Sequence, residues 1–120
     1  MGIRRILLVE DDPDVREITT VILESNGFEV VPASSGEEAI ELAQRDRIDA
    51  VLVDLTLPGM DGREVALRLQ DYPVAILTGH DVDVVIPGAS MVLQKPMAAE
   101  QLIKAVRVLL ATTEDYEQSA

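Results

Sequence analysis

The sequence predicts an α/β fold with a doubly wound, five-stranded parallel sheet. Short apolar runs alternate with amphipathic segments along the 120 residues. Runs such as residues 6–9 and 50–53 are apolar without interruption, as strands buried on both faces are. The segments between the runs carry helical spacing and helix start signals. Strands that alternate with helices in this way form a parallel sheet with helices on both faces.

Composition limits the number of domains and the kinds of partner. A length of 120 residues fits one domain, so we expect a single domain over residues 1–120, with a loosely ordered tail from about residue 112. A net charge of −12 argues against direct nucleic-acid binding, which needs clustered Lys and Arg. Without cysteine, the chain has neither disulfides nor a thiolate metal site. No apolar stretch approaches the roughly 18 residues of a membrane helix, and the N-terminus lacks a signal peptide's features. We therefore expect a cytoplasmic protein with no membrane partner.

The expected strands are short, mostly apolar runs that stop at polar or turn-forming residues. The first run stops at three consecutive acids, and the third ends on Asp54. These stops matter because the residue after a strand is placed at the edge of the sheet. The strands are expected at residues 6–9, 28–31, 50–53, 74–77 and 91–93.

The expected helices begin and end at recognisable signals. Pro13 suits a first helical turn, and the Asn26–Gly27 pair is a C-cap signal. In the second helix Ser35 is the N-cap, and Glu38 completes a capping box. Two further helices are expected, a short one after Gly62 through residues 65–69 and a last one over residues 98–111.

The connection between the fourth and fifth strands differs from the others. Residues 79–88 are few, rich in β-branched side chains and end in Pro-Gly. Such a segment disfavours a full helix. We therefore expect a fourth helix that is shortened or missing.

Charged residues follow three of the expected strands. Glu10 and Asp11 come directly after the first strand, Asp54 ends the third, and Lys95 follows the fifth. Ligands bind beyond the carboxyl ends of such strands, at the point where the strand order reverses. With the strand order 2-1-3-4-5, the first and third strands are neighbours there and their acids converge.

Converging carboxylates predict a cation and a particular chemistry. Clustered acids cannot all stay ionised without a cation, and oxygen ligands without His or Cys favour a hard ion such as Mg²⁺. Asp54 can then act as a nucleophile toward a phosphoryl group, with the metal and Lys95 neutralising the phosphoryl oxygens. Taken singly, each acid is better explained as a solvated loop residue; their joint placement favours a site.

Four motifs, taken in order, resemble those of response-regulator receiver domains in two-component signalling. They are Val9-Glu10-Asp11-Asp12, residues 53–62, Leu77-Thr78-Gly79 and Gln94-Lys95-Pro96, and together they span essentially the whole chain. The resemblance implies a flavodoxin-like fold with strand order 2-1-3-4-5. It also implies a phosphorylation switch that receives its phosphoryl group from a sensor histidine kinase or a phosphotransfer domain and acts on a downstream protein effector. Such a domain is not an enzyme beyond catalysing its own phosphorylation and dephosphorylation. The region around Gln94-Lys95-Pro96 is similar to receivers fused to hybrid histidine kinases.

The resemblance assigns roles to the acidic residues. Asp54 matches the phosphoacceptor and Asp11 the direct Mg²⁺ ligand. Glu10 matches the second acid, which acts on the metal through water, and the backbone carbonyl of Thr56 supplies a further ligand. Asp12 lies one position beyond the usual pair and is expected to be peripheral.

The resemblance also identifies the residues that respond to the phosphoryl group, and one departure. Thr78 and Lys95 match the hydroxyl and the cation that bind the phosphoryl oxygens, and the Lys95–Pro96 bond is cis in the family. The family's aromatic switch position is Val92 here, which has no ring to move. We therefore expect the mobile element to be residues 79–88, with Val92 as a passive packing residue.

Two other functions were weighed. A phosphate-insensitive interaction module is suggested by Val92 and the short segment 79–88. An aspartyl phosphatase would carry a second Asp two residues after the nucleophile, where this chain has Thr56, and this argues against it.

His80 is expected to be an exposed loop residue. Arg16, like Arg4 and Arg5, is expected to be solvated or paired with acids.

Overall fold

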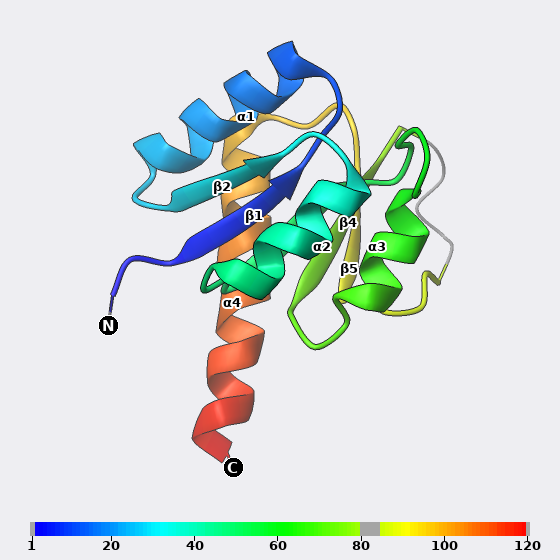
Figure 1. The fold of residues 1–120 in the computed structure, drawn as a ribbon. Helices are drawn as coiled ribbons and strands as arrows, with labels where there is room; N and C mark the ends of the chain where they lie inside the picture. The colour runs from blue at the N-terminus through cyan, green and yellow to red at the C-terminus, as the bar shows by residue number, and fades with distance from the viewer. Residues whose placement is uncertain (1, 80–84, 120) are drawn as a thin grey trace.

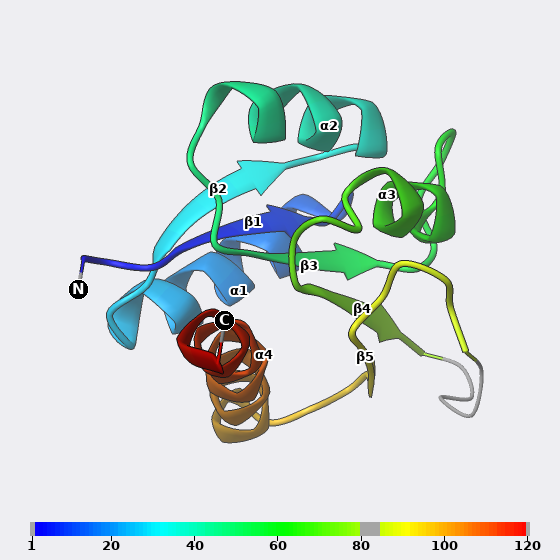
Figure 2. The ribbon, with the colours of Figure 1, turned by 90° about the horizontal axis from the view of Figure 1, so that it is seen from below.

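The computed structural model describes residues 2–79 and 85–119, with side chains described as far as residue 111. Five parallel strands form one sheet in the order β2-β1-β3-β4-β5 (Figures 1 and 2), which confirms the predicted topology. The strands are β1 (Arg5–Val9), β2 (Glu29–Ala33), β3 (Ala50–Asp54), β4 (Val74–Thr78) and β5 (Met91–Gln94).

Helices cover both faces of the sheet. Figure 2 shows α2 (Gly36–Arg45) and α3 (Gly62–Arg68) on one side, with α1 (Pro13–Ser25) and α4 (Ala99–Ser119) on the other. Each central strand divides its side chains between two hydrophobic clusters; in β1, Leu7 packs toward α2 and α3, and Leu8 toward α1 and α4. Double-sided burial is the reason these strands are uninterrupted apolar runs.

Most helices begin where the sequence predicts, but one capping hydrogen bond has a different donor from the predicted one. α1 begins at Pro13, and the Ser35 hydroxyl accepts a hydrogen bond from the Glu38 amide at 3.1 Å. The Glu38 carboxylate accepts from the Ser34 amide at 2.6 Å, one residue before the N–H that a standard capping box uses. Asp61 caps α3 by accepting from the Glu64 amide.

Two elements, β2 and α4, end more than one residue beyond their predicted ends. β2 covers residues 29–33, not 28–31, because it pairs with β1 from Arg5↔Glu29 to Val9↔Ala33. Pro32 is tolerated in it because β2 is an edge strand and Pro lacks an amide donor. α4 continues to Ser119, beyond the predicted end at residue 111, since residues 112–119 contain neither Gly nor Pro to stop a helix.

The connection from β4 to β5 contains no helix in its described part, which comprises residue 79 and residues 85–90. This agrees with the predicted shortening or loss of the fourth helix. Ile86 is 4% exposed and joins the hydrophobic cluster beneath α3. Gly88 has a φ of 90°, and a Cβ there would lie 2.5 Å from the Ala66 carbonyl oxygen, so the segment lies tightly against α3. His80 falls outside the described residues.

None of the described helices combines the length and the apolar composition that crossing a membrane requires.

Candidate functional site

The acids predicted to converge lie together at the carboxyl end of the sheet. Glu10 and Asp11 follow β1, and Asp54 ends the neighbouring strand β3, where Val9 is in register with Val53. Each acid offers a carboxylate oxygen, and these oxygens lie within 4.8 Å of one another. Glu10 is 3% exposed and Asp54 7%, whereas Asp11 is open to solvent. Two buried carboxylates therefore face a third that solvent reaches.

Lys95 supplies positive charge to this cluster. Its Nζ donates to Asp54 Oδ2 at 3.0 Å and lies 3.7 Å from Glu10 Oε1. The Lys95 amide donates to the Thr78 carbonyl oxygen at 2.7 Å, which ties the end of β5 to the end of β4, and the Lys95–Pro96 peptide is cis. One ammonium group thus serves two buried carboxylates.

The loop after β3 folds back over the Asp54 carboxylate. The Thr56 amide donates to Asp54 Oδ1 at 3.0 Å. The Gly62 amide donates to the Leu55 carbonyl at 3.0 Å, and a Cβ at Gly62 would lie 2.5 Å from the Asp54 carbonyl oxygen. The sequence motifs do not predict this close approach at Gly62, which only the absence of a side chain permits.

The acidic loop between β1 and α1 is held by residues for which no site role was predicted. The Asp12 side chain caps α1 by accepting from the Asp14 and Val15 amides, a role that an Asp directly before an N1 proline could have indicated. Arg16 was expected to be solvated or paired with acids. Instead its guanidinium Nη1 donates to backbone carbonyls, at 2.8 Å to Glu10 and 3.4 Å to Asp11.

The net effect of burial and neighbouring charges is to raise the pKa of Glu10 and of Lys95. Burial, reinforced by the neighbouring charge of Asp54, raises the pKa of Glu10 to about 7, although the Asp12 amide and Lys95 act in the opposite direction. Burial alone would lower the pKa of Lys95, but the hydrogen bond and charge of Asp54 outweigh it and raise that pKa above its ordinary value. The cluster therefore has more negative charge than Lys95 alone can balance, and its all-oxygen donor set fits a hard divalent cation.

Thr78 lies beside the acids at the end of β4, and Val92 lies further back in the sheet, paired with Ile76. Thr78 ends β4 and is 1% exposed, next to the pair Asp54↔Leu77. Val92 is half-buried on β5 and packs against the hydrophobic cluster under α2 and α3.

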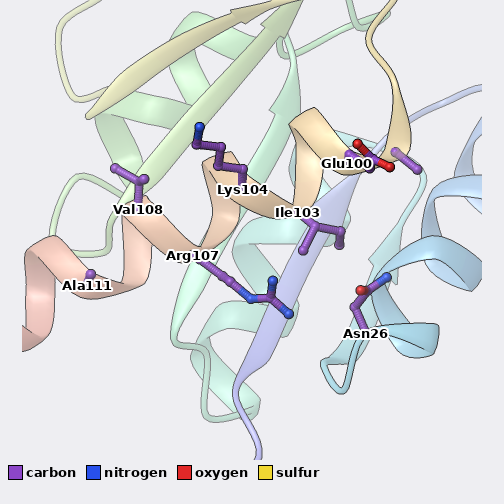
Figure 3. A pocket seen from close by; sticks show the side chains of 8 residues that line it. Asn26, Glu100, Ile103, Lys104, Arg107, Val108 and Ala111 are labelled. Atoms are coloured by element: carbon purple, nitrogen blue, oxygen red, sulfur yellow. The ribbon is translucent and has the colours of Figure 1, made fainter.

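A hollow of about 660 Å³ lies along α4 (Figure 3), away from the acids. Its lining includes Lys104, Arg107 and Glu100, and it contains none of the clustered carboxylates. A smaller groove of about 290 Å³ adjoins the cluster between α1 and α4. Glu10 and Lys95 line one part of that groove, and apolar side chains such as Ile18 and Met97 line the rest. Glu10 and Lys95 therefore border an apolar groove.

Comparison with known proteins gives one consistent family. A curated relative, the response regulator MprA of Mycobacterium leprae, is 41% identical over 118 residues, covering 91% of this chain and 52% of that protein. The MprA of Mycolicibacterium vanbaalenii is also 41% identical, with 51% of its length covered. The chain thus spans about half the length of the curated relatives it matches.

Solved structures agree in fold. The N-terminal domain of a response regulator/sensory box/GGDEF protein from Carboxydothermus hydrogenoformans is 32% identical, with a TM-score of 0.83 over 94% of this chain and 98% of that one. The response regulator TrrA of Thermotoga maritima is 30% identical, with a TM-score of 0.84 over 90% of this chain and 100% of that one.

The sequence model of the response regulator receiver domain matches residues 6–107, which is most of the chain. This match agrees with the sheet order, the acids at the ends of β1 and β3, and the lysine after β5. The chain therefore belongs to the response regulator receiver domains of two-component signal transduction.

Proposed function

We propose that Asp54 accepts a phosphoryl group from a sensor histidine kinase or phosphotransfer domain, in a reaction that requires Mg²⁺. The observation that carries the proposal is the arrangement of Glu10, Asp11 and Asp54 within 4.8 Å, with the Lys95 ammonium 3.0 Å from Asp54. Receiver domains act in general as signalling switches between histidine kinases and effectors. In this proposal the chain is not an enzyme acting on an external metabolite, and its only chemistry is its own phosphorylation and dephosphorylation.

In the proposed transfer, a carboxylate oxygen of Asp54 attacks the phosphorus of a phosphohistidine. The P–N bond breaks, its electron pair returns to the imidazole nitrogen, and an acyl phosphate forms on Asp54. Two donors hold the carboxylate beforehand, the Thr56 amide on Oδ1 and the Lys95 ammonium on Oδ2. These two hydrogen bonds hold the carboxylate in one orientation before the reaction begins.

Mg²⁺, held by Glu10, Asp11, Asp54 and the Thr56 carbonyl, would supply charge neutralisation to the phosphoryl oxygens. The excess negative charge of the cluster supports this choice, as does the related TrrA, whose structure is a complex with Mg²⁺-BeF. Lys95 would then exchange its bond to the Asp54 carboxylate for one to the phosphoryl group. The Thr78 hydroxyl, buried at the end of β4, would bind a second phosphoryl oxygen.

The surface beside the acids suits a protein donor. On α1, Ile18 is 61% exposed and Val15 38%, and both line the apolar groove that also contains Glu10 and Lys95. Exposed apolar side chains gathered beside a reactive group favour docking of another protein. We place this exchange, and the downstream protein effector, in the cytoplasm, and treat residues 1–120 as one receiver domain without direct nucleic-acid or membrane contacts of its own.

The experiment that tests the proposal is labelling with acetyl phosphate and Mg²⁺. The wild-type chain should gain one phosphoryl group, released by hydroxylamine as an acyl phosphate is, and Asp54→Asn should gain none. Asp61→Asn is the matched control, because it makes the same substitution at an exposed acid that caps α3. Labelling of Asp54→Asn at the wild-type level would show that the acceptor is another residue.

One observation favours a second function, an interaction module that does not respond to phosphate. Val92 has no ring to move, and the described part of the β4–β5 connection has no helix. Hydrogen exchange with and without beryllofluoride separates the two. A switch should show its largest change within residues 79–88, of which 80–84 lie outside the described residues; Thr78→Ala should shrink that change and Val92→Ala should leave it. The absence of any change there would favour the interaction module.

A further inference from the structure

Three successive carbonyl oxygens of the acidic loop accept hydrogen bonds from a single residue, Arg16. Its guanidinium Nη1 donates to the Glu10 carbonyl at 2.8 Å and to the Asp11 carbonyl at 3.4 Å. Its backbone amide donates to the Asp12 carbonyl at 2.9 Å, the first hydrogen bond of α1. One residue in the first turns of the helix therefore fixes the backbone of the whole loop.

The loop needs such a constraint because its side chains repel one another. Glu10 and Asp11 are consecutive carboxylates, and Asp54 lies within 4.8 Å of both. Like charges in a partly buried cluster favour conformations that separate them. The remaining contacts are few: the Glu10 amide donates to the Ala33 carbonyl, and the Asp12 amide donates to Glu10 Oε2 at 3.2 Å. Neither of these two hydrogen bonds involves the carbonyl oxygen of Glu10. Arg16 is the residue that donates to that oxygen.

We propose that Arg16 is a positioning residue for the metal site, holding the peptides of Glu10 and Asp11 so that both carboxylates face Asp54. Arg16 is half-buried on α1, and it reaches both carbonyls through one guanidinium nitrogen, Nη1, which lies one bond further along the side chain than the Nζ of a lysine would. The inference rests on the proposed Mg²⁺-dependent phosphorylation and adds a residue outside the assigned ligands. Outer contacts that orient ligands typically change metal affinity by about 10- to 100-fold.

Loss of charge and loss of positioning at Arg16 should change the affinity for Mg²⁺ in opposite directions, and this makes the inference testable. A positive charge beside a cation site repels the cation, so its removal should tighten Mg²⁺ binding. Loss of positioning should weaken Mg²⁺ binding instead. The direction of the change in Arg16→Ala therefore separates the two effects.

The experiment measures Mg²⁺ binding by isothermal titration calorimetry, together with the Mg²⁺ dependence of acetyl phosphate labelling. For Arg16→Ala we expect the Kd for Mg²⁺ to rise by roughly tenfold, with the labelling rate at saturating Mg²⁺ within about twofold of wild type, because Asp54 and Lys95 are untouched. Arg16→Lys keeps the charge on a side chain that is one bond shorter, and it should raise the Kd by about threefold, between wild type and Arg16→Ala.

The matched control is Thr20→Ala, which removes a different hydrogen bond of the same helix, from Thr20 Oγ1 to the Arg16 carbonyl at 2.7 Å. It should lower the melting temperature in EDTA but leave the Kd for Mg²⁺ unchanged. Equal or tighter binding by Arg16→Ala, or an Arg16→Lys variant indistinguishable from wild type, overturns the inference. If Arg16→Ala does not fold, Arg16→Lys decides alone. A wild-type chain that neither binds Mg²⁺ nor is labelled would instead refute the proposed function itself.

Discussion

Replacing Glu10 by Gln should make the metal-free protein more stable at neutral and alkaline pH. Glu10 is 3% exposed, and burial beside Asp54 raises its pKa from 4.5 to about 7. A carboxyl whose pKa is raised on folding contributes stability that is fully present below pH 4.5 and is lost as the pH rises toward 7. Gln resembles the protonated form: it can accept from the Asp12 amide and donate toward Asp54, and it does not titrate.

The size of this difference in unfolding free energy follows from the pKa shift of Glu10. One pKa unit corresponds to about 1.4 kcal/mol, so a rise from 4.5 to about 7 costs the wild-type protein roughly 3 kcal/mol by the time Glu10 is ionised. The free energy of unfolding of Glu10→Gln should therefore equal that of wild type in acid and exceed it by roughly 3 kcal/mol above the titration. Saturating Mg²⁺ should narrow or reverse the difference, because a ligand at a hundredfold its Kd adds about 2.7 kcal/mol to the state that binds it.

Urea unfolding followed by circular dichroism, in EDTA at about pH 4 and about pH 8, brackets the pH range over which Glu10 titrates. Glu41→Gln, at an exposed carboxylate on α2, is the control and should behave as wild type at both pH values. A Glu10→Gln variant whose stability relative to wild type does not change with pH, or that is less stable at the higher pH without metal, would refute the reasoning.

Three further predictions follow from the site. Mg²⁺ should raise the melting temperature of wild type, and Asp11→Ala should lose most of that gain; a melting curve that ignores Mg²⁺ would contradict the metal site. Lys95→Met should slow acetyl phosphate labelling by at least roughly tenfold, since it removes the ammonium 3.0 Å from Asp54, and an unchanged rate would exclude Lys95 from the transfer. Gly62→Ala should cost about 1–3 kcal/mol in urea unfolding, because its Cβ would meet backbone atoms at 2.5 Å. Gly79→Ala, which meets nothing within 4 Å, is the control, and equal stability of the two variants would refute the packing argument.

The sequence by itself determined the sheet, the placement of the acids and the family. Strands buried on both faces must be apolar at every position, so residues 6–9 and 50–53 were evident without knowledge of their neighbours. Parallel strands end at one edge of the sheet, so the acids that follow β1 and β3 had to converge there once the strand order was known. Local signals also sufficed for the Ser35 cap and for the missing helix between β4 and β5 in its described part.

Only the tertiary structure decided which contacts hold those acids in place. In the sequence Arg16 does not differ from an ordinary surface arginine. Its hydrogen bonds to the Glu10 and Asp11 carbonyls depend on how α1 packs against the end of β1. The close approach at Gly62 likewise arises because the loop after β3 returns to the strand it left. The raised pKa of Glu10 comes from burial by several elements at once. Local propensity acts over a few residues, whereas these features come from segments brought together by packing, and a pattern read along one chain does not contain them.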